Sequence, residues 1–150
     1  MSTPVLFSHS AKHWLLVPLC FVALQATANE TYDLTFQGDG SFSYPHAGDN
    51  VEAAIVEVNT DEVVAKQSGT IADTTEPAFT LQFDDALEEG KLYDLHYWID
   101  SNFGGGNEGV CDPENIDHQW RIQLGEATGD MTEVVHHAPE ELTPVCATFE

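Results

Sequence analysis

Apolar and polar residues alternate with a period of two along most of the chain after residue 29, and Gly, Asp, Asn or Pro separate the alternating runs. A period of two is typical of strands with one buried face, and no run shows the longer period of an amphipathic helix. We therefore predict an all-β domain. The pattern predicts eight strands, at residues 32–36, 51–58, 63–67, 78–83, 91–99, 119–124, 132–137 and 145–149.

Seven to eight short strands suit a β-sandwich, either immunoglobulin-like or transthyretin-like, with no substantial helix after the first 28 residues. Residues 59–62 can turn the second strand into the third, and residues 84–90 can form a short helical turn before the fifth. A chain of 150 residues with 42% apolar composition is a single domain's worth of material.

The alternation also assigns side chains to faces. The predicted core positions are Tyr32, Leu34, Phe36, Phe79, Leu81, Phe83, Tyr93, Leu95, Tyr97, Ile99, Trp120, Ile122 and Leu124. By the same parity His118 points inward at the loop end of the core. The side chains predicted to face solvent on that strand are Gln119, Arg121 and Gln123, and His96 falls on the outer side of its own strand with Asp94 and Trp98.

Residues 1–28 have the layout of a signal peptide. They contain no acid, carry Lys12 before an apolar run of about 11 residues, and end in Ala26-Thr27-Ala28, which is the small-residue pattern that signal peptidase cuts. The run is shorter than the roughly 20 residues that span a bilayer. We expect cleavage after Ala28 and an exported domain at 29–150, periplasmic or extracellular. A retained anchor and lipid attachment at Cys20 are the alternatives.

Charge restricts the partners. The chain has 26 acidic and 4 basic side chains, a net charge of -22. Without Lys12 the exported part would carry 3 - 26 = -23. Such a surface repels phosphate backbones and anionic lipids, so we expect neither nucleic-acid nor membrane binding after signal cleavage. The acidity fits either a saline habitat or bound cations.

Two cysteines remain after residue 28. In an oxidising compartment Cys111 and Cys146 are expected to form a disulfide, although a metal-binding or catalytic thiol is the alternative. The closed loop would contribute about 3 to 4 kcal/mol in the chain-entropy view.

The long acidic segment between the fifth and sixth strands predicts a calcium site. Calcium prefers six to eight oxygen ligands, and glycines let a backbone curl around an ion. The oxygens most suited to it belong to Asp100, Asn102, Asp112 and Asp117. A helix-loop-helix calcium motif is rejected, because its twelfth position is Cys111 rather than Glu and its flanks are strands. The alternative is an acidic loop held by the disulfide and by side chains that bond to its own backbone.

Several short motifs together resemble a family of small exported bacterial β-sandwich domains. They are Pro45-His46-x-Gly48, the Asp100-x-Asn102-x-Gly104 loop, Cys111-Asp112-Pro113, and Asp117-His118-x-Trp120. The resemblance implies that His46, Asp117, His118 and one of the His136-His137 pair belong together. It implies no reaction.

Histidines give the second hypothesis, a periplasmic copper- or zinc-binding protein. Imidazoles from loops at one end of a sandwich can bind either metal, and the candidates are His46, His118 and His137. Adjacent strand residues face opposite ways, so only one of His136 and His137 can join. Asp117 could orient an imidazole. The simpler alternative places His118 at the core's edge and the other histidines on the surface.

Catalysis is not predicted. The chain has no Gly-x-Ser-x-Gly elbow, phosphate-binding glycine loop or His-Glu-x-x-His helix, and its Met and Cys positions exclude a blue-copper loop. The sequence thus favours a non-catalytic exported module with a calcium-type site. The copper or zinc protein is the first alternative. The second is an adhesion module that binds a glycan or cell-surface protein through Tyr97, Trp98 and Phe103.

Overall fold

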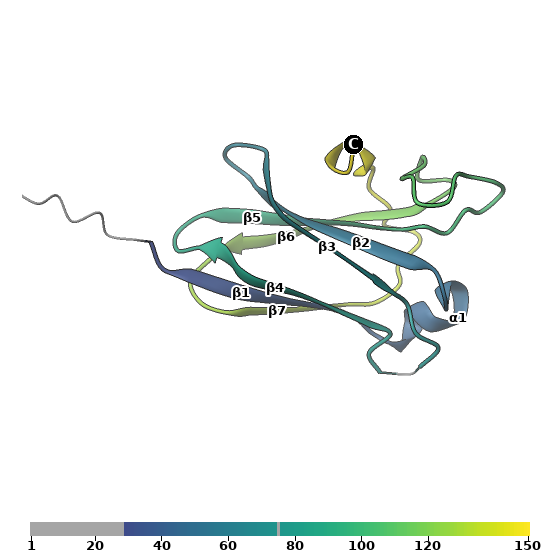
Figure 1. Cartoon of the computed structure of the whole chain (residues 1–150), viewed down its shortest axis with the longest axis horizontal. Coiled ribbons are helices and arrows are strands. Elements are labelled where there is room, and N and C mark those ends of the chain that lie inside the picture. The colour runs from purple at the N-terminus through teal and green to yellow at the C-terminus, as the bar shows by residue number, and fades with distance from the viewer. Residues whose placement is uncertain (1–28, 75) are drawn as a thin grey trace, which may run out of the picture.

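The protein folds into two stacked β-sheets, as a computed structural model that describes residues 29–74 and 76–150 shows (Figure 1). The strands are β1 (Thr31–Gly38), β2 (Asn50–Glu57), β3 (Glu62–Thr70), β4 (Phe79–Glu88), β5 (Leu92–Ile99), β6 (His118–Glu126) and β7 (Met131–Val135). The helical segments are η1 (Gly40–Phe42), α1 (Ser43–His46) and η2 (Cys146–Thr148). The predicted all-β sandwich without a substantial helix is confirmed.

The signal peptide predicted at residues 1–28 lies outside the described residues, and Cys20 lies there with it. Within the part of the chain that the structure describes, no helix has the length and hydrophobicity needed to cross a membrane.

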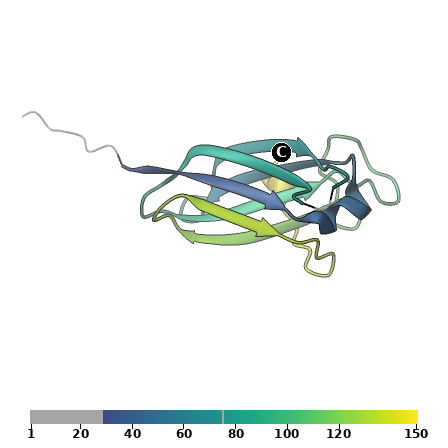
Figure 2. The ribbon, with the colours of Figure 1, turned by 90° about the horizontal axis from the view of Figure 1, so that it is seen from below.

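Strand β1 is the centre of the smaller sheet, whose order is β4-β1-β7 (Figure 2). It pairs antiparallel with β4 and parallel with β7, so the first strand lies beside the last. The larger sheet has the order β3-β2-β5-β6 and is antiparallel throughout. The helix α1 and the loop between β5 and β6 lie at the same end of the sandwich (Figure 1).

The core lies between the sheets and contains the residues that the alternation assigned to it. Side chains from β1, β4, β5 and β6 are at most 5% exposed, namely Leu34, Phe36, Phe79, Leu81, Phe83, Tyr93, Leu95, Tyr97, Ile99 and Trp120. Three further predicted core residues are partly buried against this cluster, namely Tyr32, Ile122 and Leu124. The period-two assignment of faces is therefore confirmed.

The eighth predicted strand is wrong. In place of a strand, this C-terminal segment contains the short helix η2 (Cys146–Thr148), and it packs on the outer face of the larger sheet. There the Phe149 ring meets Trp98 at 6.2 Å and the Thr148 hydroxyl lies 2.7 Å from His96 Nδ1. Gln119, predicted to face solvent, is therefore 1% exposed. The C-terminal segment covers this side chain, and the Gln119 Oε1 holds the segment in place by accepting hydrogen bonds from the backbone N–H groups of Val145 and Cys146.

The helical turn predicted at residues 84–90 is also wrong, because β4 continues to Glu88. The pairing of β1 with β4 shifts register between Tyr32 and Leu34, which leaves extra residues of β4 as a bulge. Asp85 has a left-handed φ of 52°, and its N–H donates to Asp33 at 2.8 Å. A bulge therefore takes up the Asp-rich stretch that the sequence suggested was a turn.

Candidate metal centre

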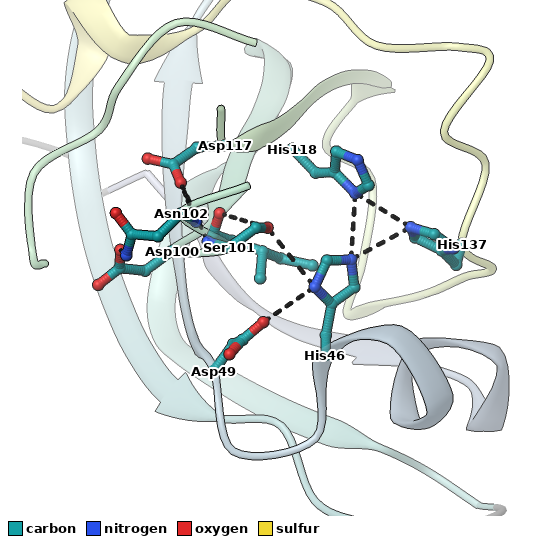
Figure 3. A network of polar contacts seen from close by, with 9 residues as sticks. His46, Asp49, Asp100, Ser101, Asn102, Asp117, His118 and His137 are labelled. Atoms are coloured by element: carbon teal, nitrogen blue, oxygen red, sulfur yellow. Dashed lines mark hydrogen bonds and ion pairs between the residues drawn. The ribbon is translucent and has the colours of Figure 1, made fainter. Parts of the chain in front are cut away.

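Three histidine rings point toward one another at the loop end of the sandwich (Figure 3). His46 Nε2 lies 3.1 Å from His118 Nδ1 and 3.2 Å from His137 Nε2, and the last two nitrogens are 3.1 Å apart. We call His46, His118 and His137 the histidine cluster. Among the described residues this is the one group of three or more His, Cys, Asp or Glu side chains whose ligand atoms lie close enough to share an ion.

Each ring comes from a different part of the chain. His46 is the last residue of α1, His118 is the first residue of β6, and His137 lies two residues beyond the end of β7. Strand parity places His118 on the same face as Trp120, as predicted, and their rings are 5.6 Å apart. The His137 backbone N–H donates to Ser41 Oγ at 2.8 Å, which ties this segment to the turn before α1.

The choice between the adjacent histidines follows the predicted alternation. His137 turns toward the cluster, whereas His136 is exposed to solvent. The simpler alternative from the sequence, with only His118 near the core and the rest at the surface, is wrong for His46. That residue is 1% exposed and belongs to the buried interior.

Asp49 orients the His46 ring, and sequence reasoning missed it. Its Oδ2 lies 3.0 Å from His46 Nδ1, so we assign the ring proton to Nδ1 as donor to this carboxylate. The Nε2 lone pair then faces the other two histidines. A carboxylate behind a ligand imidazole is the usual support of a metal-bound histidine. The i, i+3 spacing of His46 and Asp49 at the end of a short helix was the available signal.

The predicted orienting residue, Asp117, has a different role. It lies next to His118 in sequence and is fully buried, but its oxygens accept backbone N–H groups rather than an imidazole proton. Asp117 Oδ1 accepts from Ser101 and Asn102 at 3.0 Å each, and Oδ2 accepts from Asp112 at 2.9 Å.

The nitrogen triangle matches the size of a metal site. With Zn–N bonds of about 2.0 Å, tetrahedral angles require the three nitrogens to be about 3.3 Å apart. The three observed separations of 3.1 to 3.2 Å are close to that value. Three ring nitrogens facing one point cannot all be satisfied by hydrogen bonds to one another, because each N–H lies in its ring plane and aims at one acceptor. A shared cation satisfies all three lone pairs together.

The rings around the cluster make its surroundings apolar. Phe42 lies 5.5 Å from His137, Trp120 contacts His118 and His137, and Phe103 lies 5.0 Å from His118 and 5.6 Å from His46. Phe42 and Trp120 are buried, whereas Phe103 is 44% exposed. Of the aromatic residues considered for stacking on a glycan, Tyr97 and Trp98 are buried too.

Burial keeps the histidine cluster neutral. Desolvation lowers the pKa of His46 to about 4, with a smaller contribution from the charge of His137. Desolvation and the two neighbouring imidazoles likewise lower the pKa of His118 to about 4, and burial lowers the pKa of His137. Neutral imidazoles present lone pairs at neutral pH, which is the form that binds a metal.

The residues predicted to bind calcium lie beside the cluster, in the segment 100–117 that we call the acidic loop. Their carboxylates are already occupied by donors. Asp100 accepts from the Asn102 side chain at 2.6 Å and from the Gly109 N–H at 2.7 Å, and Asp112 accepts from the Asn107 N–H at 2.6 Å. Asn102 Oδ1 is buried with no hydrogen-bond partner among the described residues.

The structure therefore gives the calcium site no support. A carboxylate oxygen that accepts backbone N–H groups closes turns of the loop and has fewer lone pairs for a cation. Asp100, Asp112 and Asp117 do not form a group with a shared point of the kind that the three histidines form. The alternative from the sequence, an acidic loop held by its own backbone bonds, describes these contacts.

The predicted disulfide is present and links the acidic loop to the C-terminal segment. Cys111 and Cys146 are joined, at a sequence separation of 35. Gln119 strengthens the same junction, because its Nε2 donates to the Asp112 carbonyl at 2.7 Å. The loop that borders the histidine cluster is thus fixed to the outer face of the larger sheet.

Comparisons with protein-family models, with curated proteins and with solved structures found no match. The resemblance to exported bacterial β-sandwich domains therefore stays a prediction, and the candidate site depends on the geometry of the chain itself.

Proposed function

We propose that this protein binds one transition-metal ion, zinc or copper, through His46, His118 and His137. The observation that carries the proposal is the convergence of three neutral ring nitrogens at mutual distances of 3.1 to 3.2 Å. A hydrogen-bonded carboxylate behind His46 and an apolar surround for the other two rings support it.

The donor set selects the class of metal. Imidazole nitrogen suits zinc and copper, whereas calcium and magnesium prefer oxygen. The net charge of -22 attracts any cation to the surface and so favours capture, but it does not discriminate among metals. Selectivity therefore comes from the histidine cluster and not from the acidity of the chain.

The proposed setting is outside the reducing cytoplasm. The Cys111–Cys146 disulfide fits a non-reducing environment, and a periplasmic or extracellular location agrees with the signal peptide expected at residues 1–28. In such a setting the protein would bind, buffer or transfer a metal ion without chemistry of its own.

Elemental analysis and calorimetric titration of the purified protein test the proposal. We expect one zinc or copper ion per chain. His137→Gln removes one ligand and should weaken binding at least about 100-fold, since even the loss of a supporting contact costs 10- to 100-fold. His136→Gln is the matched control, because its side chain is adjacent in sequence and exposed. Equal affinities of His137→Gln and the parent would refute the proposal.

A further inference from the structure

The protein supplies fewer ligands than a zinc-type ion takes. Among the described residues, no fourth His, Cys, Asp or Glu side chain joins the three histidines. Structural zinc sites have four protein ligands, whereas a site with three keeps its fourth position for water or another molecule. We infer that an ion in the histidine cluster keeps one coordination position for a small exogenous ligand, water or a monodentate anion, and that this position opens on the Phe103 side. This inference rests on the proposed function.

The spacing of the nitrogens favours an ion with a fourth ligand. A planar three-coordinate ion with bonds of about 2.0 Å requires nitrogens about 3.5 Å apart, whereas a tetrahedral ion requires about 3.3 Å. The observed separations of 3.1, 3.1 and 3.2 Å are shorter than both values and closer to the tetrahedral one. An ion bonded to this triangle lies out of its plane, and that geometry leaves room for a ligand opposite the three nitrogens.

The side chains around the histidine cluster indicate from which side a ligand can reach the open coordination position. Phe42 is fully buried and Trp120 is 5% exposed, so these two rings close the core side of His118 and His137. Phe103 contacts His46 and His118 and is 44% exposed. A ligand that arrives from solvent therefore meets the edge of the cluster that Phe103 borders.

Ser101 and Asp49 do not fill the position. The Asp49 carboxylate and the Ser101 hydroxyl lie 3.0 Å and 3.5 Å from His46 Nδ1, which is the ring nitrogen turned away from the other histidines. They act on the far side of the His46 ring, as Figure 3 shows.

Cobalt(II) in place of the native metal tests the inference, because its visible absorption reports coordination number and ligand exchange. We expect the purified protein loaded with cobalt to show tetrahedral bands that change on titration with azide and saturate at one azide per cobalt. Bound cobalt with a spectrum unaffected by azide would overturn the inference and leave the proposed function standing. Failure of cobalt, zinc and copper to bind would refute the proposed function, and the inference with it.

Comparing a bulky with a small exogenous ligand tests whether the open coordination position faces Phe103. Phe103→Ala should raise the affinity for imidazole relative to azide by about tenfold, because the ring that limits the bulkier ligand is gone. Val110→Ala is the matched control, since Val110 is in the same loop and is 52% exposed. An unchanged ratio in Phe103→Ala would overturn the assignment of the Phe103 side. Both residues are exposed enough that the variants should retain the parent's far-ultraviolet circular dichroism.

Discussion

The histidine cluster and the acidic loop lie at the same end of the sandwich, and both contain residue types that bind metals. They differ in what their acceptor atoms face. The cluster's three ring nitrogens face one another at 3.1 to 3.2 Å. In the acidic loop the carboxylate oxygens face backbone N–H groups instead. Asp117 accepts hydrogen bonds from three of them, and Asp100 and Asp112 each accept at least one.

The comparison shows that residue type is a weak guide to a metal site when donors compete for the same lone pairs. A carboxylate in a glycine-rich loop finds backbone N–H groups within a few residues, so the loop itself uses the oxygens that a cation would need. An imidazole whose other nitrogen donates to a carboxylate keeps one lone pair free. Four predictions test this difference, from the largest expected effect to the smallest.

Replacing the central acceptor of the acidic loop should have the largest effect, and it should be on stability. Asp117→Ala leaves three backbone N–H groups without their acceptor inside a buried turn, so we expect the free energy of unfolding to fall by about 4 kcal/mol. Urea unfolding of the metal-free protein measures it. Asp112→Ala is the control and should lose less, because it removes the acceptor of one backbone N–H, that of Asn107. A loss below about 1 kcal/mol in Asp117→Ala would contradict the structural role of this carboxylate.

Replacing the carboxylate behind the cluster should affect metal binding and leave the fold intact. Asp49→Asn still bonds to the His46 ring but no longer supports it with a charge, so we expect zinc affinity to fall about 10- to 100-fold. Competition with a zinc-sensitive dye measures it. Asp84→Asn is a suitable control, because Asp84 is an exposed residue of β4. Unchanged affinity in Asp49→Asn would show that the 3.0 Å contact has no role in binding.

Mild acid should destabilise the metal-free protein through the cluster. The pKa values of His46 and His118 are about 4 in the fold and about 6.5 in the unfolded chain, so between these values the unfolded chain binds more protons. Stability is therefore retained above pH 6.5 and lost as the pH falls toward 4. We expect the two histidines together to lower the free energy of unfolding by about 1 kcal/mol between pH 7 and pH 6.

Two histidine variants test whether the histidine cluster causes this pH dependence of stability. Urea unfolding at the two pH values should show less pH dependence for His118→Gln than for the parent, and His136→Gln should keep the parent's dependence. The same dependence in His118→Gln and the parent would assign the effect to other groups.

Calcium should have the smallest effect. Because the acidic carboxylates already accept backbone donors, we expect millimolar calcium to leave the melting temperature within about 1 °C of its value in equimolar magnesium. Magnesium controls for screening of the acidic surface. A rise specific to calcium that Asp100→Ala abolishes would restore the calcium site predicted from the sequence.

Strand parity made much of the fold predictable from sequence. A period of two is a property of each strand alone, so the buried faces of β1, β4, β5 and β6 follow from the order of residues. The same rule placed His118 beside Trp120 and separated His137 from His136. These are local properties, and they need no knowledge of how the strands pair.

The remaining features depend on contacts between distant segments. The C-terminal segment alternates like a strand, but the disulfide and Gln119 fix it as a short helix across the larger sheet. The convergence of His46 with His137 spans 91 positions and depends on the pairing of β1 with β7. The competition for the carboxylates of the acidic loop depends on backbone turns that composition does not specify.

The parallel pairing of β1 with β7 has a kinetic consequence. A sheet whose central strand pairs with the last strand of the chain cannot be completed until nearly the whole polypeptide is available. Contacts over such long separations slow folding, because the entropy of closing a large loop is lost before the contacts form. His137 lies two residues after β7, so the three-histidine site is among the last features to assemble. A nascent chain that ends before residue 137 presents only two of its ligands.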